Sequence, residues 1–135
     1  MFYRFEIDVP FRWVDVDSAG IVNNAVYMSL MEQARYAYFT ELGLLQSHDV
    51  PFVLAETTMQ FVAPGRLGMP VKVAVATTKL GTTSFHMRYE IRSGEQVLCK
   101  ATMALVYVDN QVKATALPND FRESLTQFEQ LSSDE

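Results

Sequence analysis

Two aspartates, Asp15 and Asp17, lie a few residues before a segment with the pattern of a long apolar helix, which begins at about Asn24. A carboxylate next to a reacting carbonyl acts as a nucleophile or as a general base. The first N–H groups of a helix lack partners within the helix and carry the positive end of its dipole, so they can polarise a carbonyl or hold an oxyanion. This combination predicts acyl-group chemistry. Aspartates at such places also simply shape loops, and the spacing alone does not separate the two interpretations.

The segments around this loop predict one strand and one long helix. Strict alternation of apolar and charged residues over residues 3–9 indicates a half-buried strand. Apolar residues at steps of three and four over residues 24–42 cover most of the circumference of a helix, which is typical of a buried helix. Asn23 or Asn24 can cap its start, and Gly43 can end it.

The remainder of the chain predicts mostly strands. They are expected at residues 52–62, 71–80, 85–92, 97–108 and 112–114, followed by a short helix from about residue 118 and a frayed tail from about residue 130. The strand at 97–108 is apolar on both faces near its end, so we expect it centrally in the sheet. We therefore predict an α+β fold in which a curved antiparallel sheet of five or six strands wraps around one helix. Because such a sheet has open edges, we expect a homodimer in which the sheets join or pack, with a tetramer as the larger option.

Composition narrows the class of protein. A chain of 135 residues fits one domain, and we assign residues 1–135 to it. Its net charge is −5 and its lysines and arginines are scattered, which argues against a nucleic-acid partner. The single cysteine, Cys99, excludes an intramolecular disulfide and a Cys-rich zinc site. No apolar run is long enough for a membrane helix or a signal peptide, so we expect a soluble, cytoplasmic protein without membrane contact.

Residues 13–39 also carry a recognisable signature. It consists of an Asp-x-Asp pair, a Gly three residues later, a Val-Asn-Asn stretch, a Tyr and a Glu-x-Ala-Arg element, here Asp15, Asp17, Gly20, Val22-Asn23-Asn24, Tyr27 and Glu32–Arg35. With this signature the segment resembles the opening loop and central helix of the 4-hydroxybenzoyl-CoA thioesterase-like branch of hotdog-fold proteins. Residues 61–64, followed by Arg66, and the strand order behind them also resemble that family.

The resemblance implies a hotdog fold and hydrolysis of an acyl-CoA thioester. It implies that Asp17 is the nucleophile or the general base, and that the main-chain N–H of Asn24 polarises the carbonyl. The candidate substrate-binding residues are Gly20, Ile21, Val22, Asn23, Tyr27, Glu56, Thr57 and Thr58. The last three lie on a strand and could face the site of a partner subunit. No metal or cofactor is expected, because coenzyme A enters as part of the substrate.

One departure from the family limits the choice of branch. Many relatives carry a histidine directly after the loop glycine or at the position of Asn24, whereas this chain has Ile21 and Asn24 there. Branches that depend on that histidine therefore fit poorly. Three alternatives remain open: a thioesterase acting on acyl carrier protein, a hydratase of the same fold, and a non-catalytic acyl-CoA-binding protein.

Other reactive side chains have simpler interpretations. We expect Glu32 to be a buried helix acid paired with Arg35, and Cys99 to be a core residue. His48 and His86 are expected on the surface, which leaves a Ser-His-Asp triad with little support. Five cations are available for the phosphates of coenzyme A, and the sequence does not choose among them: Arg66, Lys79, Arg88, Arg92 and Lys100.

Overall fold

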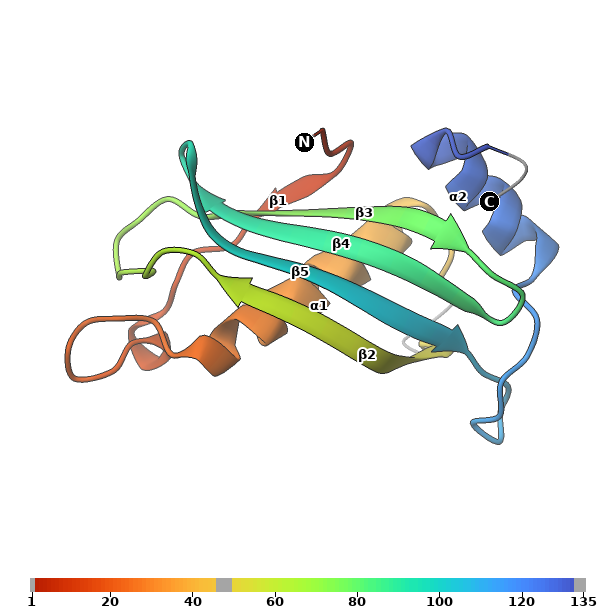
Figure 1. Ribbon diagram of the computed structural model, residues 1–135, viewed down its shortest axis with the longest axis horizontal. Coiled ribbons are helices and arrows are strands. Elements are labelled where there is room, and N and C mark those ends of the chain that lie inside the picture. Colours follow the sequence, from red (N-terminus) through yellow and green to blue (C-terminus); the bar gives the residue numbers. More distant parts are fainter. Residues whose placement is uncertain (1, 46–49, 133–135) are drawn as a thin grey trace.

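The computed structural model describes residues 2–45 and 50–132. Its elements are β1 (Glu6–Asp8), a 3-10 turn (Trp13–Asp15), α1 (Asn24–Glu41), β2 (Phe52–Phe61), β3 (Lys72–Leu80), β4 (Ser84–Ser93), β5 (Gln96–Tyr107) and α2 (Asn119–Glu129). The strands form one antiparallel sheet in the order β1-β3-β4-β5-β2 (Figure 1). The predicted α+β architecture is therefore confirmed, with five strands.

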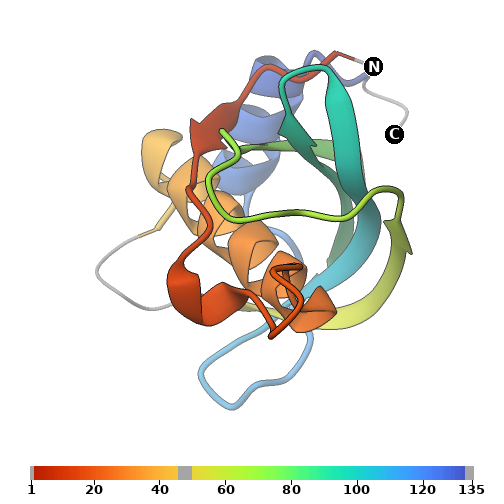
Figure 2. The ribbon, with the colours of Figure 1, turned by 90° about the vertical axis from the view of Figure 1, so that its left-hand side faces the viewer.

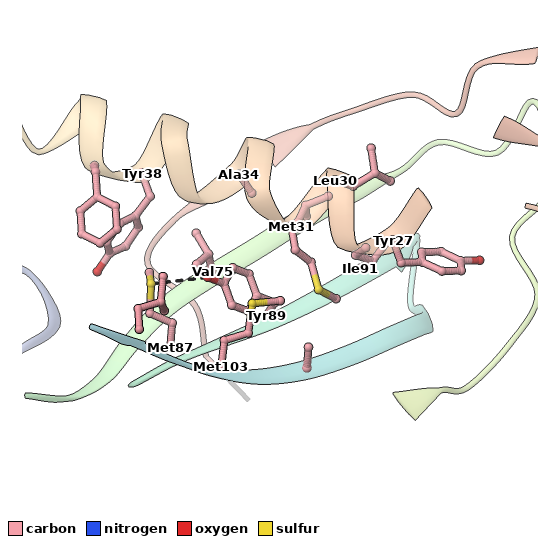
Figure 3. Close-up of a cluster of buried hydrophobic side chains, with 14 of the residues drawn as sticks. Tyr27, Leu30, Met31, Ala34, Tyr38, Val75, Met87, Tyr89, Ile91 and Met103 are labelled. Carbon is pink, nitrogen blue, oxygen red and sulfur yellow. Dashed lines mark hydrogen bonds between the residues drawn. The ribbon is translucent and has the colours of Figure 1, made fainter. Parts of the chain in front are cut away.

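The sheet curves around α1, which lies against one of its faces (Figure 2). Asn23 caps the helix, because its Oδ1 accepts a hydrogen bond from the Ala25 N–H at 3.0 Å, and Gly43 ends it with a φ of +70°. The helix face that touches the sheet is aliphatic and aromatic apart from one arginine, and Figure 3 shows its side chains meeting those of β3, β4 and β5. The buried helix residues are Tyr27, Leu30, Met31, Ala34, Arg35, Tyr38 and Phe39.

The opposite face of α1 is open in the single chain. Ser29, Glu32, Gln33 and Tyr36 are all exposed, so the expectation of a helix buried on most sides is wrong for one chain taken alone. The physical reason is that β2, at the edge of the sheet, meets the helix through Phe52 and Phe61 at its two ends and leaves the flank between them uncovered. From Val53 onward every residue of β2 is exposed except the half-buried Met59, so this strand covers little of the helix.

Several strand boundaries differ from the predictions. β1 is regular only at Glu6–Asp8, although the hydrogen bonds Val75 N to Phe5 O and Val9 N to Val71 O continue its pairing at both ends. The prediction of a strand at residues 112–114 is wrong. Only one isolated bridge, Val108 with Ala114, forms there, because the chain turns at Val112 with a φ of +60°. β5 is an interior strand, as expected, but β4 holds the middle position.

The predicted final helix is confirmed as α2, which packs beside β3. Phe121 is buried and stacks on Phe39 of α1 with ring centres 5.5 Å apart. At the last turn, the buried Glu129 carboxylate accepts hydrogen bonds from the Thr77 N–H at 2.9 Å and from the Tyr38 hydroxyl. Burial and the neighbouring Glu129 charge raise the pKa of Tyr38, so its hydroxyl stays protonated and serves as a donor.

Two of the sequence predictions concern residues that the structure does not describe, or describes only in part. His48 and its neighbour Ser47 lie outside the described residues. The tail predicted from about residue 130 is described only as far as Ser132. Within the described ranges, neither helix has both the length and the apolar character that a membrane span requires.

Candidate active site

The loop between the 3-10 turn and α1 is a small closed hairpin. Val16 and Val22 form an isolated antiparallel bridge. The Asp17 N–H donates to the Ile21 carbonyl at 2.9 Å, and the Asn23 N–H donates to the Asp15 carbonyl at the same distance. These main-chain bonds hold the two aspartates and the helix start in one compact unit.

Asp15 is the structural member of the pair. Its side chain is 2% exposed and accepts hydrogen bonds from the Arg12 N–H at 2.7 Å and from Arg12 Nη2 at 2.9 Å. Burial favours the neutral acid, but the hydrogen bonds and the positive charge of Arg12 outweigh it and lower the pKa of Asp15. Asp15 is thus an ionised, fully engaged carboxylate that fixes the loop, which matches the loop-shaping interpretation for this residue.

Asp17 is exposed and differently arranged. Its Oδ1 accepts hydrogen bonds from the N–H groups of Ala19 at 2.9 Å and Ile21 at 3.1 Å, which forms a turn at Gly20 with a φ of +78°. Its second oxygen, Oδ2, accepts no hydrogen bond from any residue that the structure describes. The carboxylate is therefore anchored by one oxygen and open to a substrate or a water molecule at the other.

A pocket of about 230 Å³ opens beside the start of α1. Its walls are mostly apolar and consist of Ile21, Val22, Asn24, Tyr27, Phe61, Val62, Ala63 and Pro64. The N–H of Asn24, the first residue of the helix, has no hydrogen-bond acceptor within residues 2–45 and 50–132. The site therefore combines an unpaired helix-start donor with an apolar recess, which can hold a carbonyl oxygen and its attached acyl group.

Tyr27 and Gly65 connect this pocket to the core. The buried Tyr27 hydroxyl accepts a hydrogen bond from the Gly65 N–H at 3.0 Å, and the Gly65 carbonyl accepts one from the Val22 N–H at 2.9 Å. Phe61 packs against the Tyr27 ring with centres 5.8 Å apart. The pocket walls are thus held by the same bonds that fix the helix start.

The structure brings together part of the predicted site. Ile21, Val22, Asn24 and Tyr27 line the pocket, and Asp17, Gly20 and Asn23 lie in the adjoining loop without lining it. Residues 56–58 lie on β2, outside this pocket. Residues 61–64 also line the pocket but are not among the predicted site residues, although their resemblance to the family was a signal that pointed to them.

The remaining side chains that could carry chemistry lie outside this pocket. Glu32 is 55% exposed and 4.0 Å from Arg35 Nη2, so the expected pairing is present but the expected burial is wrong. The guanidinium is the buried partner, and it donates to the Tyr89 hydroxyl at 3.0 Å. His86 is exposed and Cys99 is buried, as predicted. No three His, Cys, Asp or Glu side chains within the described ranges are grouped to hold a metal ion.

Comparison with known proteins gives the class of this fold and site. Residues 19–100 match the family model of the thioesterase superfamily. The acyl-CoA thioester hydrolase YbgC of Escherichia coli is 30% identical over 121 residues, which cover 80% of this chain and 90% of the relative. The chloroplastic acyl-acyl carrier protein thioesterase ATL3 of Arabidopsis thaliana is 25% identical over 130 residues, covering 91% of this chain and 68% of the relative.

A similar solved structure is that of a thioesterase from Thermus thermophilus complexed with coenzyme A and zinc. It superposes with a TM-score of 0.87 at 30% identity and covers 96% of this chain and 97% of that one. The architecture is therefore the hotdog fold of thioesterases. Within that class, the chain belongs to the thioesterase superfamily and is a thioester hydrolase.

Proposed function

We propose that this protein hydrolyses acyl-CoA thioesters at the start of α1. The observation that carries the proposal is the Asn24 N–H at the edge of an apolar pocket, which finds no acceptor in the described part of the chain, with the Asp17 carboxylate bonded through one oxygen in the adjoining loop. Asp17 is bonded through Oδ1 to Ile21, which is itself a pocket wall, so the carboxylate and the pocket share one rigid support. The acyl-CoA substrates in the names of the bacterial relatives agree with this chemistry.

In the proposed reaction, the Asn24 N–H donates a hydrogen bond to the thioester carbonyl oxygen and holds the oxyanion as the carbonyl carbon becomes tetrahedral. Asp17 Oδ2 either attacks that carbon or removes a proton from the water molecule that attacks it. The carbon–sulfur bond then breaks, and the coenzyme A thiolate leaves and takes up a proton. In the direct-attack route, water afterwards hydrolyses the acyl-aspartyl anhydride. The protein needs no metal or further cofactor in either route.

Asp17→Asn tests the proposal. The amide oxygen of asparagine can still accept from the Ala19 and Ile21 N–H groups, so the loop keeps its shape while the negative charge is lost. We expect kcat for thiol release from an acyl-CoA panel to fall by roughly 10²–10⁴-fold. The matched control is Ser18→Ala, at an exposed neighbouring position of the same loop, which should retain full activity. An Asp17→Asn protein that keeps most of its activity would contradict the mechanism.

We also propose that the active form is a homodimer, with a tetramer as the larger option. β2 is an edge strand of ten residues, and its exposed side chains include the apolar Val53, Leu54 and Phe61. A long edge of this kind presents unpaired main-chain groups that pair readily with a second strand. In such an assembly Glu56, Thr57 and Thr58 remain candidates for contact with the site of the partner. Light scattering during gel filtration tests this proposal, and a monomer at assay concentration would contradict it.

Acyl carrier protein is the second candidate carrier of the acyl group, because ATL3 is named as a thioesterase for that carrier. Assays with the same acyl group on both carriers distinguish the two. A strong preference for the carrier protein would replace the coenzyme A proposal, whereas binding of intact acyl-CoA without turnover would favour a non-catalytic role. The cytoplasmic location stays a prediction from the sequence, and fractionation of cells that express the protein checks it.

A further inference from the structure

A groove of about 580 Å³ lies on the outer face of the sheet, the face turned away from α1 and toward the viewer in Figure 1. Side chains from the N-terminal segment, β2, β4 and β5 line it. The polar and charged ones are Tyr3, Thr58, Gln60, Arg88, Tyr89, Glu90, Arg92, Lys100 and Thr102. This groove is separate from the pocket at the helix start, and the reaction proposed above does not use it.

The groove concentrates positive charge on an acidic chain. Three cations face it against one acid, whereas the whole chain carries a net charge of −5. The acid, Glu90, is largely buried and lies 3.6 Å from Arg92 Nε. Lys100 is exposed and forms no ion pair with any residue in the described part of the chain. Such a surface attracts an anion with more than one negative charge, for which Lys100 is the free ligand.

An aromatic ring stands beside these cations. The Arg88 guanidinium lies 4.9 Å from the centre of the Tyr3 ring, and its Nη2 donates to the Phe2 carbonyl at 2.9 Å. Arg88 therefore fixes the N-terminal segment and holds Tyr3 at the wall of the groove. An ordered aromatic ring next to cations and hydroxyl groups is the chemistry that recognises a phosphorylated nucleoside, through stacking of the base and hydrogen bonds to the phosphates.

The groove also lies within reach of the pocket at the helix start. Gln60 and Phe61 are consecutive residues at the end of β2, and Gln60 lines the groove while Phe61 lines the pocket. Their side chains point to opposite faces of the sheet, because successive side chains of a strand alternate between its two faces. The pantetheine arm of coenzyme A is about as long as four extended residues, roughly 15 Å. It can therefore pass around the end of β2 at Val62 with its sulfur in the pocket and its phosphates in the groove.

We propose that the outer groove binds the phosphorylated adenosine portion of coenzyme A, with Lys100 and Arg92 on the phosphates and Tyr3 beside the base. The assignment rests on the proposed acyl-CoA substrate. The assignment uses two of the five lysine and arginine side chains that the sequence makes available as phosphate ligands. Arg66 lies on the pocket side, where Ile21 bridges to it, and Lys79 lines neither site.

Lys100→Glu and Lys100→Gln test the assignment, because Lys100 is exposed and has no ion-pair partner in the described ranges. Lys100 lies opposite Glu90 in the β4–β5 register, so the glutamine variant, which removes the positive charge without placing two carboxylates opposite each other, should show the same direction of change. We expect KM for acyl-CoA to rise about tenfold or more, with kcat retained, since a phosphate contact is replaced by a repulsion. Hydrolysis of the same acyl group on N-acetylcysteamine, which lacks the nucleotide, should be unchanged. Lys100→Arg, which keeps the positive charge, should retain the low KM of the parent. The matched control is Lys79→Glu, an equal charge change at an exposed lysine outside the groove.

Calorimetric titration of coenzyme A separates this assignment from the proposed hydrolysis, because binding needs no turnover. If coenzyme A binds more weakly to Lys100→Glu than to Lys79→Glu, the result supports the groove as the nucleotide site, even if no thioester were hydrolysed. Equal binding by both variants overturns it. So does an equal loss with acyl-CoA and the N-acetylcysteamine thioester, which would mean a structural defect. Lys100→Glu could instead weaken only the activity on acyl carrier protein, or change only the subunit assembly seen in gel filtration. Either result would replace the nucleotide-binding assignment with a protein-docking role for this face.

Discussion

Replacement of Gly65 by alanine should damage the fold and the pocket together. A Cβ atom at this buried position would lie 2.6 Å from the Tyr27 hydroxyl oxygen and 2.8 Å from Phe11 Cζ, both closer than real Cβ contacts. Phe11 and Tyr27 are themselves 6% and 2% exposed, so both rings are packed among other side chains and cannot move without disturbing them. Overpacking of this kind costs about 1–3 kcal/mol of unfolding free energy.

The expected size of the effect is measurable. For a chain of 135 residues, 1 kcal/mol corresponds to a change of about 3.5 °C in Tm, so Gly65→Ala should lower Tm by about 4–10 °C. The displaced Tyr27 is a wall of the pocket at the helix start, so kcat/KM for thioester hydrolysis should fall as well. Leu67→Ala, at an exposed position in the same loop, is the control and should stay within about 0.5 kcal/mol of the parent.

A double-mutant cycle with Tyr27→Phe identifies the cause. Tyr27→Phe alone leaves the Gly65 N–H without its acceptor, which costs about 1–3 kcal/mol at a buried site. In the double variant the hydroxyl oxygen that the new methyl group would strike is absent, so the combined loss should be smaller than the sum by about 1 kcal/mol. A Gly65→Ala protein with the parent Tm and activity, or strictly additive losses, would refute the steric account.

Three further predictions concern the loop and the core. Asn23→Ala removes the cap on Ala25 and should lower the unfolding free energy by about 1 kcal/mol in a denaturant titration, whereas Asn23→Asp should not. Burial raises the pKa of Cys99 to about 11, so the thiol should react with Ellman's reagent at pH 8 only after unfolding, and rapid labelling of the native protein would contradict this. The pKa of Asp15 is lowered on folding, so its stabilisation is present above the unfolded pKa and is lost as the pH falls through the folded value. The stability difference between the parent and Arg12→Ala should therefore shrink between pH 6 and pH 3, roughly the range in which aspartates titrate, and a constant difference in urea unfolding would argue against the pairing.

The local patterns of the sequence predicted most of the fold. Alternation and helical spacing depend on which side of an element is buried, and they identified α1, α2 and four of the strands closely. The strand predicted at residues 112–114 failed because a single residue, Val112, adopts a left-handed conformation that valine rarely takes and that no local pattern announces. The uncovered flank of α1 was missed for a different reason. An apolar helix surface indicates that a cover is needed, but it does not say whether the same chain supplies it.

The candidate site was predicted only in part for a similar reason. Asp17 and Asn24 lie within one short stretch of sequence, and the motif was enough to select them. The far wall of the pocket comes from residues 61–64, which meet Tyr27 only through the folding of β2 and the Gly65 loop. Residue type alone did not distinguish Asp15 from Asp17, and the resemblance to the family selected Asp17. The fold shows how their surroundings differ, because Arg12 engages Asp15 and leaves Asp17 to the loop N–H groups.

The buried Glu129 carboxylate has a consequence for how the C-terminal helix finds its position. Phe121 and Leu125 give α2 an apolar stripe, and apolar contacts are non-directional, so on their own they discriminate weakly against a shift of one turn. Glu129 does not allow that shift, because only the observed position offers it the Thr77 N–H and the Tyr38 hydroxyl, and any other would strand a charge among apolar side chains. The carboxylate thus fixes the position of α2 along β3. A Glu129→Leu variant should keep the helix but allow it more than one position on β3.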